Sequence, residues 1–331
     1  MKKIIASSLL CRSGLRSFLH RVFRWSGVLG INYHRIGKVG DLGFDRNSWS
    51  ADADAFAEQL RFCKTHLDII DPDDLPYVRA AKRGRHAIIT FDDGYRDNYE
   101  VAFPILQREG VTATFFVSSG FIDSPKLPWW EEIAWMVQAS QHGEMELPAW
   151  FDVPVRFDKP YREGAVHMLL KKYKALPGSA TTGFMEALAV AAGTGRSRVE
   201  MSNGLWMTWD MLRKMQSAGM TIGGHSVTHP VLSNLPQQDQ QREIMECGQR
   251  LLQELGRPMR YFSYPVGKAT TFDSTTRACL RQAGVSHAFS YYGGYRRFDD
   301  WDDYDVRRVA VETDLSAELF RSIITLPQVF A

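Results

Sequence analysis

Two adjacent carboxylates are the first residues in this chain whose types and spacing suggest chemistry. Asp92 and Asp93 lie in the segment Ile88–Gly94, directly after an apolar run that is rich in isoleucine. Because neighbouring residues of an extended chain point to opposite sides, one carboxylate can bind a metal while the other faces a reacting water. Asp-Asp-Gly is also a common turn sequence, so this segment alone does not establish a site.

Two histidines form the second group. His225 and His229 are four residues apart in the segment Ile222–Pro230, a spacing that places two imidazoles on one turn. Pro230 disfavours helical geometry at His229, so we expect a turn that follows a strand rather than a helix. Such pairs also occur by chance, but the strand-end setting favours metal ligands. With one aspartate they give three protein ligands and an open position for water, whose pKa a bound zinc lowers to about 7.

A third segment, Arg260–Gly267, reads as an apolar strand that ends in Tyr264, Pro265, one further residue and a glycine. A turn of this kind can direct a backbone N–H at a developing oxyanion. Taken alone, the segment is equally well explained as a strand followed by an ordinary turn.

The elements that must position these residues are short apolar strands alternating with longer helical stretches. Glycines stand where helices are expected to stop, at positions 110, 219, 256 and 284. Strands are expected at 28–33, 67–70, 87–91, 113–117, 220–224, 261–264, 285–290 and 306–311, and helices at 52–65, 99–107, 208–217, 237–255 and 274–282.

Seven or eight such units predict an α/β fold in which a parallel sheet, covered by helices, closes into a barrel. An open, doubly wound sheet is the alternative, but the sequence has no dinucleotide fingerprint or phosphate loop that favours it. The stretch from about 121 to 205 breaks the rhythm, and we interpret it as a tryptophan-rich insertion over the active-site mouth of a barrel that spans 27–331. Trp129 and Trp130 in this insertion either stack on sugar rings or form its own small core.

Taken together and in this order, the three segments resemble the polysaccharide deacetylases related to the nodulation chitooligosaccharide deacetylase, carbohydrate esterase family 4. The segments 90–94 and 225–230 match the first two motifs of that family, and 262–267 is similar to the third. Asn32–Ile36 and Trp129-Trp130 resemble a bacterial subgroup associated with exopolysaccharide or surface-glycan synthesis. The resemblance covers roughly residues 27–325.

The resemblance implies a deformed (β/α) barrel that removes acetyl groups from an N-acetylated sugar. It implies a divalent metal, most often zinc with cobalt or nickel as alternatives, held by Asp93, His225 and His229. Asp92 becomes the general base for attack of a water held by the metal. The backbone N–H of Tyr264 becomes an oxyanion donor, and Trp129, Trp130, Tyr264 and Pro265 become the expected substrate contacts.

This chain departs from the family pattern in two places. An arginine that orients the catalytic aspartate is missing from the third motif, where Ser263 and Tyr264 stand. Arg260 lies upstream and is expected to point elsewhere, and Arg308 on the last strand is a candidate replacement. The C-terminal Leu-x-His that supplies the acid is also missing. His34, at the end of the first strand, is the candidate acid, whereas His287 is expected to be a core residue.

Composition limits the partners and the location. Forty Lys and Arg against 38 Asp and Glu give a net charge of +2, too balanced to indicate nucleic acid. Residues 1–26 predict a basic amphipathic helix, which either packs on the domain or contacts an anionic membrane face. The segment is not a convincing signal peptide and the four cysteines are scattered, so we expect a cytoplasmic enzyme, with peripheral contact to the inner membrane as a variant.

Two other functions compete with a deacetylase. The missing arginine and histidine are compatible with a degenerate glycan-binding or scaffold protein. A metallohydrolase acting on another small amide is the second alternative, although the tryptophan-rich insertion favours a sugar. The sequence leaves the glycan, its linkage and the oligomeric state open.

Overall fold

The computed structural model describes residues 25–38, 44–158 and 161–331. The helix expected over residues 1–26 therefore lies outside the described residues, apart from its last two positions. Within the described ranges, no helix is long and apolar enough to cross a membrane. Three cysteines, Cys63, Cys247 and Cys279, are buried free thiols.

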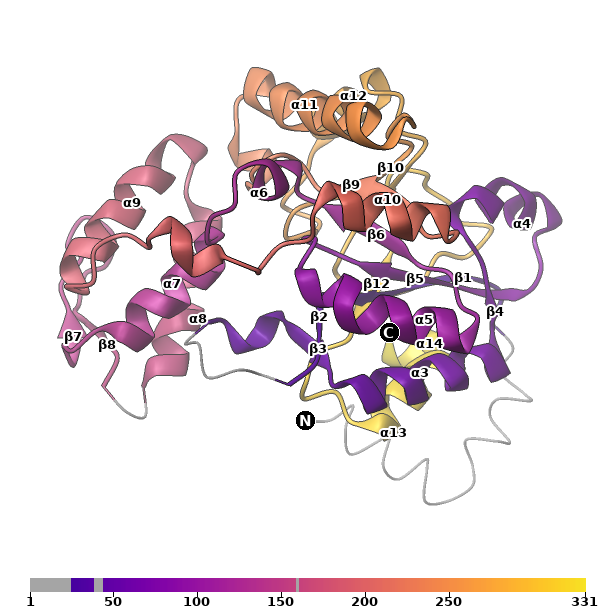
Figure 1. Ribbon diagram of the computed structural model, residues 1–331, viewed down its shortest axis with the longest axis horizontal. Coiled ribbons are helices and arrows are strands. Elements are labelled where there is room, and N and C mark those ends of the chain that lie inside the picture. The colour runs from indigo at the N-terminus through magenta and orange to yellow at the C-terminus, as the bar shows by residue number, and fades with distance from the viewer. Residues whose placement is uncertain (1–24, 39–43, 159–160) are drawn as a thin grey trace.

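Eight parallel strands form the centre of the fold (Figure 1). Seven of them lie side by side in the order β11-β10-β9-β6-β5-β1-β12, and β4 pairs with the start of β5. Every strand expected from the sequence is present in this sheet. The bounds are β1 Gly27–Tyr33, β4 Asp68–Ile69, β5 Arg85–Phe91, β6 Thr114–Val117, β9 Thr221–Gly224, β10 Tyr261–Ser263, β11 His287–Phe289 and β12 Arg308–Ala310.

The two end strands of this sheet approach each other and nearly close it. Phe289 of β11 forms a parallel bridge with Val306, just before β12. The Val306 N–H donates to the Ala288 carbonyl at 2.9 Å, and the Ser290 N–H donates to the Val306 carbonyl at 3.0 Å. The expected barrel is thus confirmed, and the open sheet is excluded.

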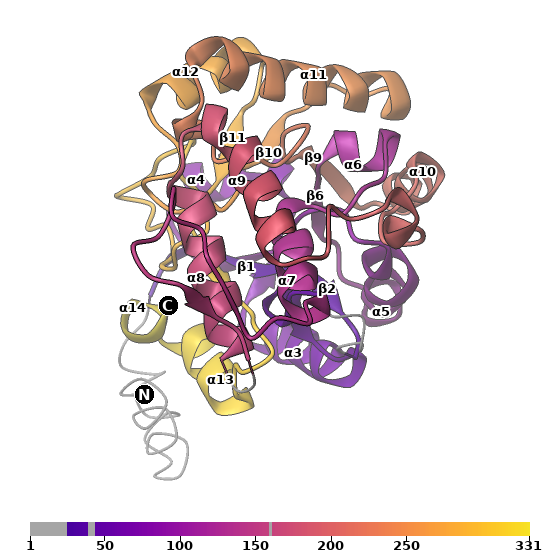
Figure 2. The same ribbon diagram turned by 90° about the vertical axis from the view of Figure 1, so that its left-hand side faces the viewer.

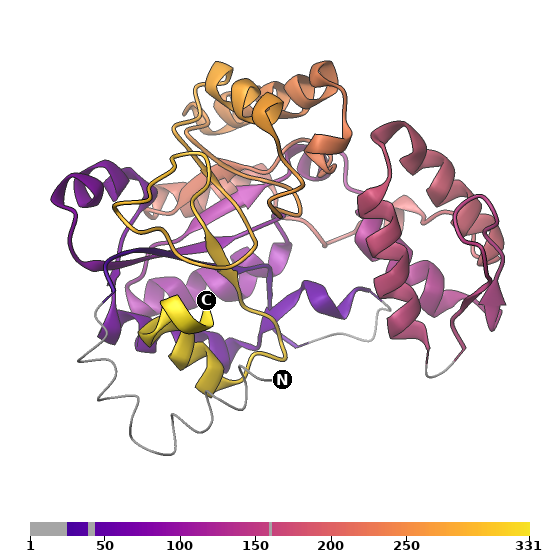
Figure 3. The same ribbon diagram turned by 180° about the vertical axis from the view of Figure 1, so that it is seen from behind.

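Helices cover the outside of the barrel (Figures 1 and 3). Side chains of Asp52, Thr208, Asp273 and Ser316 accept backbone N–H groups at the first turns of α3, α10, α12 and α13. One expected helix, 99–107, is instead a π-helical segment, Asn98–Ala102, followed by α5. The bounds are α3 Ala53–His66, α4 Leu75–Ala81, α5 Phe103–Glu109, α6 Ser119–Asp123, α10 Trp209–Ser217, α11 Gln237–Leu255, α12 Ser274–Gln282, α13 Ala317–Thr325 and α14 Pro327–Phe330.

The segment after α6 forms a lobe beside the barrel, seen at the left of Figure 1 and facing the viewer in Figure 2. Its buried apolar side chains form a cluster distinct from the barrel core. Helix α9 of this lobe was not expected from the sequence. The lobe consists of α7 Trp129–Ala139, the antiparallel pair β7 Glu144–Met145 and β8 Val155–Arg156, α8 Arg162–Ala175 and α9 Gly178–Ala191. At the rim of the barrel, β2 Arg35–Ile36 pairs with β3 Trp49–Ala51.

Candidate metal centre and active site

The carboxyl ends of the barrel strands open into a cavity of about 1040 Å³. Residues from both the barrel and the lobe line it, so helix α8 forms one wall and the strand ends form the floor. The predicted metal and catalytic side chains meet on this floor. Those that line the cavity are His34, Asp92, Asp93, Trp129, Trp130, His225, His229 and Tyr264.

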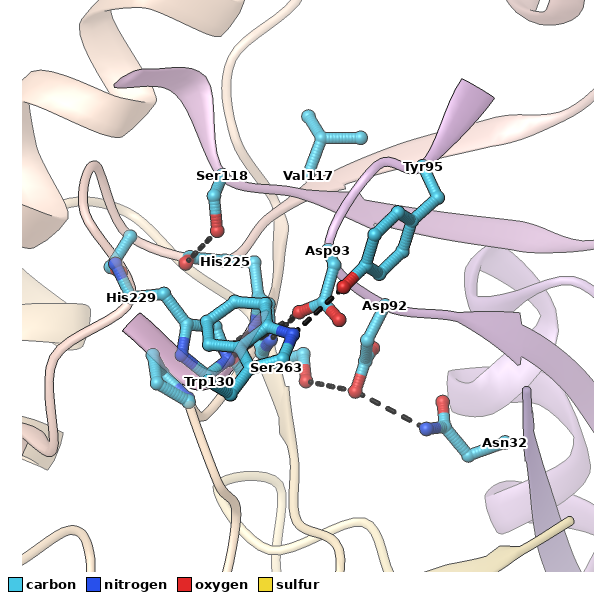
Figure 4. A network of polar contacts seen from close by, with 12 residues as sticks. Asn32, Asp92, Asp93, Tyr95, Val117, Ser118, Trp130, His225, His229 and Ser263 are labelled. Atoms are coloured by element: carbon cyan, nitrogen blue, oxygen red, sulfur yellow. Dashed lines mark hydrogen bonds and ion pairs between the residues drawn. The ribbon is translucent and has the colours of Figure 1, made fainter. Parts of the chain in front are cut away.

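Asp93, His225 and His229 converge on one point, and all three are buried (Figure 4). The Oδ1 atom of Asp93 lies 3.4 Å from Nε2 of each histidine. One ligand atom from each residue falls within 4.8 Å of the others. Asp93 Oδ1, the atom that faces Nε2 of both histidines, is buried and takes no hydrogen bond, and an unsatisfied atom of this kind needs an explanation. An Asp/His/His set with this unsatisfied carboxylate oxygen at its centre fits a divalent cation.

Protonation also suits a cation here. Burial and the neighbouring His225 lower the pKa of His229 to about 3, so its imidazole is neutral and can offer a lone pair. Burial alone would raise the pKa of Asp93, but the nearby histidines outweigh it and hold the pKa below its usual value. The carboxylate therefore stays ionised.

Backbone strain is concentrated in these loops. Within the described ranges five non-glycine residues have a positive φ, and four of them belong to this site. Positive φ is uncommon outside glycine and costs of order 1–3 kcal/mol where the conformation is sparsely populated. Such strain persists only where surrounding contacts enforce it. The four site residues are Asp93 (75°), Ser226 (65°), His229 (58°) and Val266 (62°).

The turn that carries the two histidines is held by hydrogen bonds to neighbouring elements of the barrel. Buried Glu243 of α11 accepts the N–H groups of Val227 and Thr228, each at 2.8 Å. His225 Nδ1 lies 2.7 Å from the Ser263 carbonyl, which aims the opposite nitrogen, Nε2, at Asp93. The strained turn is therefore held in one geometry.

Asp92, which precedes Asp93 in the chain, forms an ion pair with Arg308. The two guanidinium nitrogens of Arg308 lie 2.8 and 2.9 Å from the two Asp92 oxygens, and the arginine is fully buried. Burial alone would raise the pKa of Asp92, but Arg308 and His225 hold it well below its usual range. The candidate replacement named from the sequence thus contacts the aspartate in a bidentate pair.

Two small residues make room for that arginine. A Cβ atom on Gly30 of β1 would lie 2.4 Å from Cγ of Arg308, so only glycine fits opposite it. Ser263 accepts from Arg308 Nη2 at 2.7 Å and donates to Asp92 Oδ2 at 3.2 Å. Asn32 also contacts both, with its Oδ1 2.5 Å from Arg308 and its Nδ2 3.3 Å from Asp92. The Arg308 Nε donates to the Ser290 carbonyl at 3.0 Å, so every nitrogen of the guanidinium has a partner.

Trp129 and Trp130 belong to the buried core of the lobe and also line the cavity. Trp129 donates its indole N–H to the His229 carbonyl at 3.0 Å. The Trp130 ring centre lies 4.4 Å from that of His229. Both rings are more than nine-tenths buried, so their observed contacts are with a candidate metal ligand rather than with open solvent.

A family profile described as polysaccharide deacetylase matches residues 79–144 and 157–288, which include both aspartates and both histidines. The chain belongs to the polysaccharide deacetylase family.

Related proteins agree with this assignment. A poly-β-1,6-N-acetyl-D-glucosamine N-deacetylase of Staphylococcus aureus is 26% identical over 112 residues, which are 30% of this chain and 39% of that relative. The aligned region thus spans well under half of the relative's length. Two solved structures share the fold: the Streptococcus pyogenes deacetylase PplD in complex with acetate (TM-score 0.59, 16% identity, 93% of this chain and 100% of that one) and IcaB from Ammonifex degensii (TM-score 0.57, 19% identity, 92% and 98%).

One residue assigned through the family resemblance has to be corrected. The Tyr264 N–H continues the sheet and donates to the Phe289 carbonyl at 3.0 Å, so it is not free for an oxyanion. The Tyr264 ring is stacked on Phe272 and its hydroxyl donates to the Tyr304 carbonyl at 2.9 Å. Pro265, the other expected substrate contact of this segment, is buried and is not among the residues that line the cavity.

Val266, two residues beyond Tyr264, has the properties that were expected of the tyrosine. It lines the cavity, its φ is positive, and within the described part of the chain no acceptor takes its N–H. The sequence could not show where the backbone hydrogen bonds of β10 end, and this end decides which amide is free. The candidate oxyanion donor therefore moves from Tyr264 to Val266.

The other histidines and arginines named from the sequence lie as follows. His34 lines the cavity, and its ring packs edge-on against Tyr291 at 5.4 Å between centres. Arg260 points to the outside and pairs with Asp73 at 2.5 Å. His287 is buried on β11, 3.4 Å from Asp303.

Asn32, Ser263 and Glu243 were missed by sequence reasoning. Each is a polar residue at a buried position, and for Asn32 a polar side chain in an otherwise apolar strand is a signal that the sequence offers.

Proposed function

We propose that this chain is a metal-dependent hydrolase that removes N-acetyl groups from a glycan built of N-acetylhexosamine. The observation that carries the proposal is the meeting of Asp93, His225 and His229 with an ionised Asp92 on the floor of one cavity. Family membership supports the same reaction, and the Staphylococcus aureus relative is named for it.

Asp93 and the two histidines would hold the cation, most readily zinc. Bound there, it would act as a Lewis acid and lower the pKa of a coordinated water. The remaining chemistry belongs to side chains and amides of this chain.

Asp92 acts as the general base in this proposal. Its Oδ2 atom already receives hydrogen bonds from Arg308, Ser263 and Asn32, whereas Oδ1 receives one, from Arg308 at 2.8 Å. Oδ1 therefore has a free lone pair with which to accept a proton. Arg308 keeps the carboxylate ionised and fixes its plane, so a proton acceptor of fixed orientation is present at neutral pH.

The oxyanion and the leaving amine need a donor each. Val266 lies in a strained turn at the cavity wall, no acceptor takes its N–H within the described residues, and this N–H is the proposed oxyanion donor. His34 is the proposed acid for the departing amine, because it lines the same cavity and replaces the missing C-terminal histidine. Since Arg308 supplies the contact that the third motif lacks, the degenerate-site alternative loses one of its two arguments.

The decisive experiment is an acetate-release assay on the full chain. Wild-type protein loaded with zinc, cobalt or nickel is incubated with β-1,6- and β-1,4-linked N-acetylglucosamine oligosaccharides and with lipid-linked precursors, and acetate and free amine are quantified. We expect equal amounts of both products from at least one glycan. Metal-loaded protein that releases neither from any of them would refute the proposal.

Location is a separate part of the proposal. We infer a cytoplasmic protein whose basic segment 1–26 contacts an anionic membrane surface. Co-sedimentation with phosphatidylglycerol vesicles, but not with phosphatidylcholine vesicles, is the expected result. Equal recovery with both vesicle types would contradict it.

A further inference from the structure

Glu131 is a fully buried carboxylate that the proposed chemistry does not use. It stands in the first turn of α7 and has no exposed surface. The helix begins with the two tryptophans that contact His229, so Glu131 lies where the lobe meets the barrel.

Three donors from the barrel side converge on this carboxylate. Oε2 accepts the Asp45 N–H at 2.6 Å, and Oε1 accepts the hydroxyls of Tyr95 at 2.8 Å and Ser48 at 2.9 Å. Asp45 and Ser48 line the cavity, and Tyr95 directly follows Asp92, Asp93 and a glycine in the chain. One side chain of the lobe thus holds the cavity rim and the loop of the catalytic aspartates.

The same network continues to a metal ligand. The Tyr95 hydroxyl, which donates to Glu131, accepts the indole N–H of Trp130 at 2.7 Å. The Trp130 ring packs against His229 with 4.4 Å between ring centres (Figure 4). The path from Glu131 to the metal ligand therefore runs through two aromatic side chains with little rotational freedom.

The charged groups that face Glu131 do not neutralise it. Arg35 of β2 lies 3.9 Å away, but its guanidinium makes its short contact, 2.9 Å, with Asp97. Asp45 is itself an acid, and Tyr95 is a neutral donor. Burial outweighs Arg35 and raises the pKa of Glu131 to about 7. Protonation of Glu131 would add an O–H donor where the Asp45 N–H and the Tyr95 and Ser48 hydroxyls already donate. The carboxyl group could then accept fewer of these hydrogen bonds.

We propose that ionised Glu131 is a positioning residue, which fixes the 45–48 segment and, through Tyr95 and Trp130, the orientation of His229. This inference rests on the proposed function for its kinetic consequence. Its structural consequence, the anchoring of the 45–48 segment, is independent of any activity.

The anchoring of the 45–48 segment and the contribution of Glu131 to folding stability change in opposite directions as pH rises. The folded pKa of Glu131 lies above its unfolded value, so the folded chain binds more protons between the two values. The contribution of Glu131 to stability is fully present below its unfolded pKa and is lost as pH rises through about 7. Anchoring, which requires the carboxylate, increases over the same rise.

Glu132 offers a matched control on the same helix. It is also buried, but its partners are Arg196, at 2.9 Å from both carboxylate oxygens, and Ser197, and none of these lines the cavity. Although burial raises its pKa, Arg196 outweighs this and holds the pKa below the usual value. Glu132→Gln therefore loses a buried carboxylate without touching the site.

The test measures hydrogen exchange of the peptide that covers residues 44–51, together with kcat/KM, from pH 6 to 8 on zinc-loaded full-length protein. In the wild type we expect exchange of this peptide, corrected for its intrinsic rate, to slow as pH rises through about 7. Glu131→Gln should exchange fast throughout and lose kcat/KM on the order of tenfold at pH 8, less than the hundredfold that a 1 Å displacement can cost. Glu132→Gln should keep the wild-type pH profiles of exchange and of kcat/KM. It should lose more folding stability at pH 8 than Glu131→Gln does.

Wild-type exchange and pH profile in Glu131→Gln would overturn the inference. A wild type that releases acetate from no glycan would instead refute the proposed function, while the exchange data would still decide the role of Glu131. Tyr95→Phe provides a second variant without a change in charge. It removes the link to Trp130 but leaves the contacts of Glu131 to Asp45 and Ser48, so it should lower kcat/KM while the 44–51 peptide keeps its wild-type exchange.

Discussion

Arg308 and Asp92 form a bidentate ion pair inside the barrel, with nitrogen–oxygen distances of 2.8 and 2.9 Å. Arg308 lies on β12 and Asp92 directly follows β5, two strands that are separated by β1 in the sheet and by most of the chain in sequence. This pair supplies, from the last strand, the arginine contact that the third sequence motif lacks. It also sets the charge of the proposed base.

Removing the Arg308 charge should move the acidic limb of the pH–rate profile. In Arg308→Met the burial of Asp92 is no longer opposed by the guanidinium, so the pKa of Asp92 rises and activity is lost at a higher pH. We expect kcat/KM at pH 7 to fall by about 10²-fold or more, the range of general base catalysis.

The matched controls for this prediction are Arg308→Lys, which keeps the charge but not the bidentate geometry, and Arg307→Met on the neighbouring, partly exposed residue. Arg308→Lys should shift the acidic limb less than Arg308→Met. An acidic limb that is the same in all three variants would show that Arg308 does not control Asp92.

Gly30 should be intolerant of even one methyl group. Its Cβ would lie 2.4 Å from Arg308 Cγ and 2.8 Å from the Arg307 carbonyl oxygen. We expect Gly30→Ala to lower the free energy of unfolding by about 1–3 kcal/mol, the usual cost of overpacking, and to lower activity by displacing Arg308. Urea denaturation measures the first effect.

Gly164→Ala is the control for this change, because a Cβ atom there has nothing within 4 Å and the residue lies in α8. Alanine is favoured over glycine inside a helix, so this variant should gain stability. Equal unfolding free energies for the two variants would contradict the packing argument.

His34 can be tested as an acid by changing the leaving group. We expect His34→Gln to lose most amide hydrolysis, on the order of 10²-fold or more. The same variant should retain activity toward an aryl acetate ester, whose phenolate departs without protonation. His167→Gln, which changes another cavity-lining histidine on α8, serves as the control. Parallel loss of amide and ester hydrolysis in His34→Gln would exclude the acid role.

The sequence predicted the residues whose positions depend on local structure. Asp92, Asp93, His225 and His229 could be placed because each lies where an apolar strand ends, and parallel strand ends meet at one rim. The eight strands were predicted for the same reason, since their apolar runs are short and bounded by turn residues.

The residues that were mistaken or missed depend on pairing and packing across the sheet. Tyr264 was named as oxyanion donor through the family resemblance, and nothing in the sequence reveals that its N–H bonds to the Phe289 carbonyl. Gly30 and Ser263 became meaningful only once the sheet placed Arg308 beside them. Glu131 follows two tryptophans in an amphipathic-looking segment, and its link to His229 exists only in the folded lobe.

The division of roles between Asp92 and Asp93 is the central claim, and one measurement tests it most directly. Bound zinc and released acetate are determined on the same samples of wild type, Asp92→Asn and Asp93→Asn with an N-acetylglucosamine oligosaccharide. We predict that Asp92→Asn binds zinc like the wild type but loses 10²- to 10⁴-fold in rate, the contribution of a general base, whereas Asp93→Asn loses zinc itself. Equal zinc content and equal rates in the two variants would contradict this account.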